Sequence, residues 1–193
     1  MGFHSPPPTA AWRHQVARSG FEVVYFRSPG DGHLLEGCTT ALENGATWVV
    51  EYTISLDDRW TTRNAHITSR SVHGSRSISL DADGLGRWRI DGEPAPHLDG
   101  CLDVDLESSA MTNTLPVHRT DLPIGEAMSA PAAYVRALDL SVSRLDQTYL
   151  RLPDAPEGHR YDYAAPAFDF TGVLAYDSCG LVLDYPGIAL RVA

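Results

Sequence analysis

Apolar and polar residues alternate along most of this chain, and turn residues separate the alternating runs. The clearest run places apolar side chains at every second position: Trp48, Val50, Tyr52, Ile54 and Leu56. Because successive side chains of a strand point to opposite faces, this pattern predicts a half-buried strand. Asn44-Gly45 precedes the run and favours a hairpin turn, since both residues tolerate positive φ. The partner strand is then expected at residues 34–42.

Further runs with a period of two predict a sheet of about ten strands. Besides this hairpin, strands are expected at residues 21–26, 75–80, 88–90, 132–138, 145–152, 161–163, 168–176 and 181–190, and Leu98–Leu106 also alternates. Helical character is limited to a possible short helix near residues 107–121 and to residues 127–140, which Pro131 interrupts. A sheet of this size must curve to bury one face, so we predict a mainly β fold, a strongly curved antiparallel sheet with a concave surface and one or two short helices.

Composition and charge narrow the possible partners. A chain of 193 residues with 43% hydrophobic and 21% charged residues fits one folded domain. The net charge of -10 argues against binding to nucleic acids or to anionic membrane surfaces. All fifteen basic residues are arginine, which excludes chemistry that needs a lysine amine.

The ends of the chain and its cysteines suggest a compartment. Residues 1–11 are proline-rich and are expected to be a disordered lead-in to a single domain at residues 12–193. They do not resemble a secretory signal, and no apolar run is long enough to span a membrane. Cys38, Cys101 and Cys179 form no zinc motif and suit small core residues in a reducing cytoplasm. We therefore expect a cytoplasmic protein without membrane insertion, metal or cofactor.

Residues 98–119 hold the densest group of polar side chains. Asp103 and Asp105 lie two apart, so on a strand they share one face. Two such carboxylates can act as acid and base or bind a divalent cation. They can equally be solvent-facing acids on either side of a buried Val104, an interpretation that the regular alternation favours.

Arg63 lies on the expected strand face of Thr61, Ala65 and Ile67, where a guanidinium needs a partner. That partner is expected to be Asp103, Asp105 or Asp184 in a buried ion pair, or else a phosphate or carboxylate of a ligand.

The segment Thr112–Arg119 resists a simple assignment. The residue before Pro116 is pushed towards an extended conformation, which predicts a rigid, non-helical loop. Asn113 and its neighbouring threonines either recognise a sugar or head group or cap turns. His118 next to Arg119 is expected to be a surface pair. Nucleophile elbows and glycine-rich phosphate loops are absent from the sequence.

Several motifs in order resemble the putative glycolipid-binding family, formerly a domain of unknown function. They are Tyr52-Thr-Ile-Ser-Leu-Asp57 with Trp60 and Arg63; Leu80-Asp-Ala-Asp-Gly84 with Trp88; Leu98-Asp-Gly-Cys-Leu-Asp-Val-Asp-Leu106; Thr112-Asn-Thr-Leu-Pro-Val-His-Arg119; Gln147-Thr-Tyr149 with Arg151; and Gly180-Leu-Val-Leu-Asp-Tyr-Pro-Gly187. The resemblance covers nearly all of residues 12–191. It implies a half-barrel similar to those of lipoprotein and lipid carriers, and it carries over no catalytic residue.

The resemblance and the residues together favour a non-enzymatic protein that binds an amphipathic ligand, such as a glycolipid. Its apolar part would lie on the aromatic-lined concave face, and Arg63, Asn113 and Arg119 would meet the polar head. The candidate ligand-binding residues are Trp60, Arg63, Asp103, Asp105, Asn113, Arg119, Tyr149 and Asp184. Two alternatives stay open: a hydrolase that uses Asp103 and Asp105, and a structural or interaction domain without a ligand.

Overall fold

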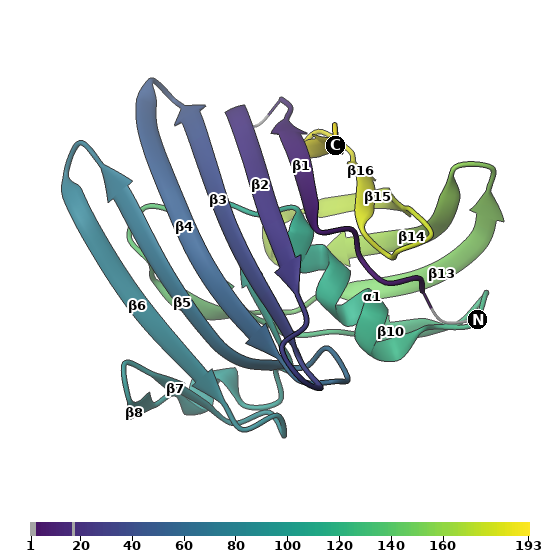
Figure 1. Cartoon of the computed structure of the whole chain (residues 1–193), viewed down its shortest axis with the longest axis horizontal. Helices are drawn as coiled ribbons and strands as arrows, with labels where there is room; N and C mark the ends of the chain where they lie inside the picture. Colours follow the sequence, from purple (N-terminus) through teal and green to yellow (C-terminus); the bar gives the residue numbers. More distant parts are fainter. Residues whose placement is uncertain (1–2, 17) are drawn as a thin grey trace.

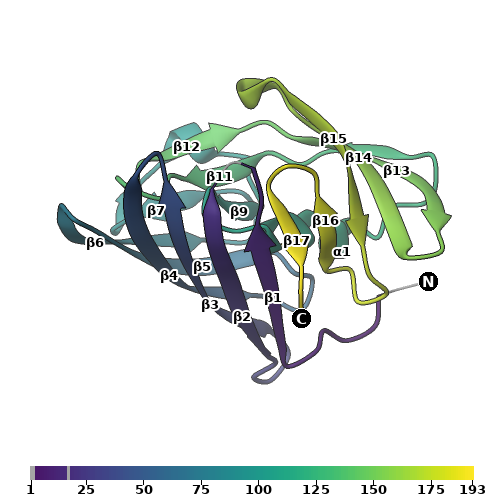
Figure 2. The same cartoon turned by 90° about the horizontal axis from the view of Figure 1, so that it is seen from above.

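A long antiparallel sheet forms most of the computed structural model, which describes residues 3–16 and 18–193 (Figure 1). Its fourteen strands follow the order β10-β13-β14-β15-β16-β17-β1-β2-β3-β4-β5-β6-β7-β8 and do not close into a barrel. Their bounds are β1 (Thr9–His14), β2 (Ser19–Arg27), β3 (His33–Glu43), β4 (Ala46–Leu56), β5 (Thr62–Ser71), β6 (Gly74–Ala82), β7 (Trp88–Ile90), β8 (Glu93–Pro94), β10 (Ala127–Ser129), β13 (Thr148–Ala155), β14 (Gly158–Ala165), β15 (Phe170–Tyr176), β16 (Val182–Tyr185) and β17 (Ala189–Arg191). Strands β13–β15 run across the direction of β1–β6 in Figure 1, and the view from above shows that the sheet is strongly curved (Figure 2). The predicted fold class is thus confirmed.

The hairpin β3–β4 shows how alternation and turn chemistry build this sheet. Glu43 pairs with Ala46, which leaves Asn44-Gly45 as a two-residue turn. Both turn residues have positive φ, 50° and 79°, as predicted. The single strand expected at residues 181–190 is instead two strands, β16 and β17, because Pro186 and Gly187 turn the chain between them.

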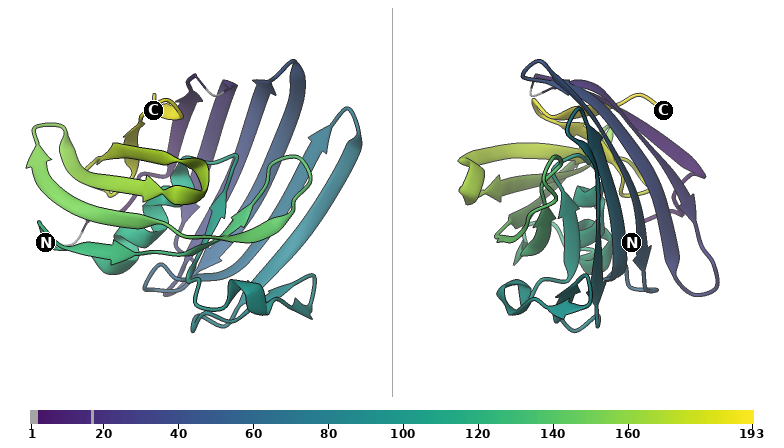
Figure 3. Two further views of the ribbon diagram at one scale, coloured as in Figure 1. Left: turned by 180° about the vertical axis from the view of Figure 1, so that it is seen from behind. Right: turned by 90° about the vertical axis from the view of Figure 1, so that its left-hand side faces the viewer.

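A second, three-stranded sheet has the order β12-β11-β9 and consists of β12 (Val142–Leu145), β11 (Ala132–Val135) and β9 (Asp103–Leu106). Strand β9 belongs to residues 98–121, which we call the central segment. The central segment also contains the 3-10 helix η2 (Met111–Asn113) and the helix α1 (Thr114–Thr120). Two further 3-10 helices are η1 (Pro96–Leu98) and η3 (Pro166–Phe168). Figure 3 shows the central segment on the inner side of the curved sheet.

The helix α1 replaces the rigid loop expected at Thr112–Arg119. Pro116 lies in its first turn, where a missing N–H is tolerated. Asp121 ends the helix with a left-handed conformation, and its N–H bonds the carbonyl of Val117. No helix among the described residues is long and apolar enough to cross a membrane.

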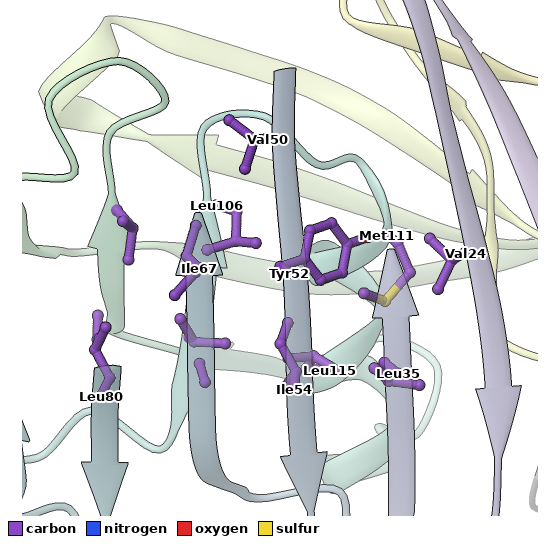
Figure 4. Close-up of a cluster of buried hydrophobic side chains, with 14 of the residues drawn as sticks. Val24, Leu35, Val50, Tyr52, Ile54, Ile67, Leu80, Leu106, Met111 and Leu115 are labelled. Carbon is purple, nitrogen blue, oxygen red and sulfur yellow. The ribbon is translucent and has the colours of Figure 1, made fainter. Parts of the chain in front are cut away.

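The main core lies between the large sheet and the central segment. Val24, Leu35, Ile54 and Ile67 come from β2–β5, and Leu106, Met111 and Leu115 face them from the central segment (Figure 4). A smaller core gathers the buried Tyr149, Tyr161, Tyr163 and Tyr176 around Val117 of α1. The inner face of β1–β5 is therefore covered by the chain itself, and the apolar part of a ligand would have to lie elsewhere.

The N-terminal region is more ordered than its prolines suggested. Residues 9–11, expected to be part of a disordered lead-in, belong to β1 and pair with β2. The reason is that β1 alternates as well, with Ala10 and Trp12 fully buried. Met1 and Gly2 lie outside the described residues.

Candidate functional site

The most deeply buried carboxylate belongs to Glu22, on the inner face of β2. Its Oε1 accepts hydrogen bonds from the Tyr52 hydroxyl at 2.6 Å and from the Ser109 hydroxyl. Its Oε2 accepts the backbone N–H groups of Ala110 at 2.8 Å and Met111 at 3.4 Å. Burial raises the pKa of Glu22, and these donors oppose the rise. All four partners are internal, so Glu22 anchors the start of η2 to the large sheet.

Asp103 forms a bidentate ion pair with Arg119 of α1. Arg119 Nε donates to Oδ1 at 3.1 Å and Nη2 donates to Oδ2 at 2.7 Å. The Asp103 side chain is only 2% exposed. Burial raises its pKa, and the guanidinium opposes that rise. The expectation that Asp103 faces solvent is therefore wrong, because α1 covers this face of β9.

Asp105 is buried beside the same helix and has different partners. Its Oδ1 accepts the Thr112 hydroxyl at 2.7 Å, and its Oδ2 accepts the Gln147 side-chain amide at 2.8 Å. No arginine pairs with it among the described residues. Burial is the main cause that raises the pKa of Asp105 to about 6. The expectation of an exposed carboxylate is wrong here too, since Thr112 and Gln147 cover it.

Asn113 connects the central segment to the tyrosines of the smaller core. Its Oδ1 lies 2.9 Å from the Tyr149 hydroxyl, which is also 3.0 Å from Gln147 Oε1. The Tyr176 hydroxyl donates to the backbone carbonyl of Asn113 at 3.2 Å. One hydrogen-bonded row therefore links Asp105, Gln147, Tyr149 and Asn113. In this row the side-chain amide of Gln147 orients both the Tyr149 hydroxyl and the Asp105 carboxyl group.

A pocket of about 390 Å³ opens beside this row, between the small sheet and β14–β16. We call it the aromatic pocket, because five rings line it: Tyr134, Tyr163, Phe168, Phe170 and Tyr185. Its polar and charged lining residues are Arg18, Asp105, Glu107, Ser109, Asn113 and Arg136, and Leu106, Leu145 and Ile188 complete it. Rings that can stack on a sugar or alkyl chain thus face several polar groups that can fix its orientation.

Trp60 lies at a different pocket, of about 340 Å³, at the other end of α1. Its ring stacks on His118 with centroids 3.8 Å apart, and His33 lies 4.4 Å from it. His118 Nε2 is 2.8 Å from the carbonyl of Cys179, and burial lowers the pKa of His118 to about 4. The expected surface pair of His118 and Arg119 is wrong, because the two side chains contact different internal partners.

Arg63 and Asp184 do not join either group. Ser55 pairs with Asn64 and Leu56 with Thr62, so Arg63 is the extra residue of a β-bulge and is exposed. Its only ion pair among the described residues is to Asp57 at 3.9 Å, which corrects the expected buried pair with Asp103, Asp105 or Asp184. Asp184 is half-buried on β16, and the adjacent Tyr185 enters the aromatic pocket, so Asp184 points to the opposite face.

Five of the eight predicted site residues therefore converge: Asp103, Asp105, Asn113, Arg119 and Tyr149. Of these, Asp105 and Asn113 line the aromatic pocket. The sequence reasoning overlooked Glu22 and Arg18. For Glu22 a signal existed, since the alternation of β2 places it on the same face as Val24, where an acid is unusual.

The arrangement of the two aspartates bears on the acid–base alternative. Both oxygens of Asp103 are occupied by Arg119, and only Asp105 lines a pocket. Within residues 3–16 and 18–193, no group of three or more His, Cys, Asp or Glu side chains is placed to hold a metal ion.

Comparisons with known proteins place the chain in a family. Its fold is similar to the crystal structure of a DUF1089 family protein from Pseudomonas aeruginosa, with a TM-score of 0.76 and 31% identity over 98% of this chain and 95% of the other. A β-barrel-like protein of a domain of unknown function from Brucella abortus shares the fold at a TM-score of 0.53 and 9% identity, over 98% and 96% of the two chains. No curated protein matches the chain. The family described as "Putative glycolipid-binding" matches residues 9–191, so the chain belongs to that family.

Proposed function

We propose that this protein binds an amphipathic molecule of the glycolipid class in the aromatic pocket, without a chemical reaction. The observation that carries the proposal is the joint presence of five aromatic rings and several converging polar groups in one pocket. Small-molecule sites combine apolar walls with a few fixed polar groups in this way. The family description supports the ligand class.

The pocket suggests how the ligand is divided between its walls. A sugar ring stacks well on a flat aromatic face. Tyr185 packs edge to face on both Tyr163 and Phe170, so the pocket offers rings in more than one orientation. Asn113, held by Tyr149, supplies a fixed amide for sugar hydroxyls. A volume of about 390 Å³ suits a head group and the first carbons of a chain. The rest of a long chain would leave the pocket along Phe168, which is 46% exposed.

Binding of a short alkyl glycoside to delipidated protein tests the proposal. Isothermal titration with octyl β-D-glucoside, below its micelle concentration, should show saturable binding to one site. Phe168→Ala should weaken glucoside binding about fivefold, since the Phe168 ring would contact the alkyl chain of the ligand and not its sugar. Phe21→Ala is the matched control, because Phe21 is 50% exposed but lies on the outer face of β2, away from the pocket. Absence of binding to the wild-type protein, or equal loss in both variants, would count against the proposal.

A further inference from the structure

Arg18 is a buried guanidinium whose hydrogen bonds are incomplete. Its side chain is 8% exposed, lines the aromatic pocket and lies over the Trp48 ring, 5.2 Å from the centroid. Nη1 donates to the carbonyl of Glu107 at 3.0 Å. Nη2 comes no closer than 3.8 Å to the Glu43 carboxylate, beyond hydrogen-bond range, and Nε has no partner among the described residues. A buried N–H without a partner is costly, so this edge calls for an acceptor.

Another arginine of this chain, Arg119, shows which group binds the Nε and Nη2 edge of a guanidinium. Arg119 uses its Nε and Nη2 together to bind both oxygens of Asp103. This fork geometry matches carboxylates and phosphates. Arg18 carries the same two nitrogens, but its Nε has no partner among the described residues and its Nη2 has the Glu43 carboxylate at 3.8 Å, so this edge leaves room for a closer anion.

A second group of unpartnered atoms lies nearby. His14 is 6% exposed, and neither of its ring nitrogens makes a well-formed hydrogen bond within the described residues. Burial, and then the charge of the neighbouring Arg18, lower the pKa of His14 to about 4, so the ring is neutral near pH 7. On β17 its partner is Ala189, next to the pocket residue Ile188. His14 does not line the aromatic pocket and is neutral, so it offers Arg18 no negative charge in place of a ligand anion.

The acids of the pocket do not fill this role. Glu107 is held by Arg136 at 3.3 Å and by the Ala137 N–H at 2.8 Å. The oxygens of Asp105 are engaged by Thr112 and Gln147. Neither acid of the pocket therefore offers Arg18 a carboxylate, and an anionic group of a ligand can supply the acceptor that Nε lacks.

We infer that the amphiphile carries an anionic group, a carboxylate or a phosphate, and that Arg18 binds it through Nη2 and Nε. This inference rests on the proposed function, since it specifies the head group of the same ligand. It makes Arg18 the residue that selects acidic over neutral glycolipids, while the rings of the aromatic pocket bind both.

Three amphiphiles of equal chain length test the inference by titration calorimetry: octyl β-D-glucoside, octyl β-D-glucuronide and octyl phosphate. At least one anionic probe should bind about tenfold tighter than the glucoside, and the two anionic probes separate a carboxylate from a phosphate preference. Arg18→Gln should remove this advantage, so that the anionic probes bind the variant no tighter than the glucoside does. Arg63→Gln, an exposed arginine outside the pocket, should change nothing.

Each result bears on a different statement. If all three probes bind the wild-type protein equally, the anion site is wrong and the proposed function stands. If none binds, the proposed function fails and the inference fails with it. The ratio of the three wild-type affinities decides this even if Arg18→Gln does not fold.

Discussion

The carboxylate of Glu22 accepts a hydrogen bond from the backbone N–H of Ala110 at 2.8 Å, across 88 positions of sequence. This contact joins the middle of β2 to the start of η2, where backbone N–H groups have no partner within the helix. With the Ser109 and Tyr52 hydroxyls on the other oxygen, it fixes the central segment on the inner face of the large sheet.

Replacing Glu22 by Gln should lower the free energy of unfolding by about 2 kcal/mol. With its nitrogen towards the two hydroxyls, which can accept as well as donate, the Gln amide can keep hydrogen bonds to all its partners, but it loses the negative charge that strengthens them. Urea denaturation followed by circular dichroism measures the change. Glu51→Gln is the control, because Glu51 is about half exposed. A Glu22→Gln protein as stable as this control would contradict the anchoring role.

The raised pKa of Asp105 predicts a specific pH dependence. Because the folded pKa of about 6 lies above the usual value of 3.8, the folded state holds the proton more tightly than the unfolded chain. This contribution is fully present below pH 4 and is lost as the pH rises to about 6, by about 3 kcal/mol. Asn at this position carries no charge; its oxygen can accept from the Gln147 amide, and its nitrogen can donate to the Thr112 hydroxyl. The difference in unfolding free energy between Asp105→Asn and wild type should therefore shift in favour of the variant between pH 4 and 7. A difference that stays constant over this range would show that Asp105 titrates normally.

The ion pair of Asp103 and Arg119 should behave as a unit. Arg119→Gln leaves a buried carboxylate without its fork and should cost about 3 kcal/mol. Adding Asp103→Asn removes the stranded charge, so the double variant should recover part of this loss. A double-mutant cycle in urea measures the coupling between the two residues. Additive effects would mean that the two side chains do not depend on each other.

Gly180 supports the stack at the Trp60 pocket. A Cβ at this position would lie 2.6 Å from His118 Nε2, and the backbone has φ +70°. Gly187 has a similar φ of +74° and open space around it. Ala at Gly187 should cost about 1 kcal/mol of backbone strain, and Ala at Gly180 about 1 kcal/mol more from the clash. If the two variants unfold at the same temperature, the His118 ring does not lie against Gly180.

The periodic parts of the sequence predicted the sheet well. Alternation and the Asn44-Gly45 turn suffice for β3 and β4, because one face of each strand packs against the core and the other meets solvent. This contrast disappears in β9, whose four residues are all buried. Asp103 was therefore assigned to solvent, although α1 brings Arg119 to it from 16 positions further along the chain.

Single-residue irregularities explain other errors. The bulge at Arg63 moves it to the exposed face, and nothing in the pattern of residues 61–67 marks the shift. The aromatic pocket could not be predicted from the sequence either. Its rings come from β11, β14, β15, β16 and η3, which only the folded chain brings together. Residue spacing, local side-chain chemistry and the family motifs indicate Asn113 and Asp105 as candidates, but their neighbours depend on the path of the central segment.

The most direct test of the account is a crystal structure of the protein grown with octyl β-D-glucoside. We expect the sugar ring in the aromatic pocket, in contact with Tyr163 and Tyr185 and within hydrogen-bonding distance of Asn113, with the alkyl chain leaving along Phe168. A glucoside bound at the Trp60 pocket instead, or an aromatic pocket empty at saturating ligand, would contradict the account.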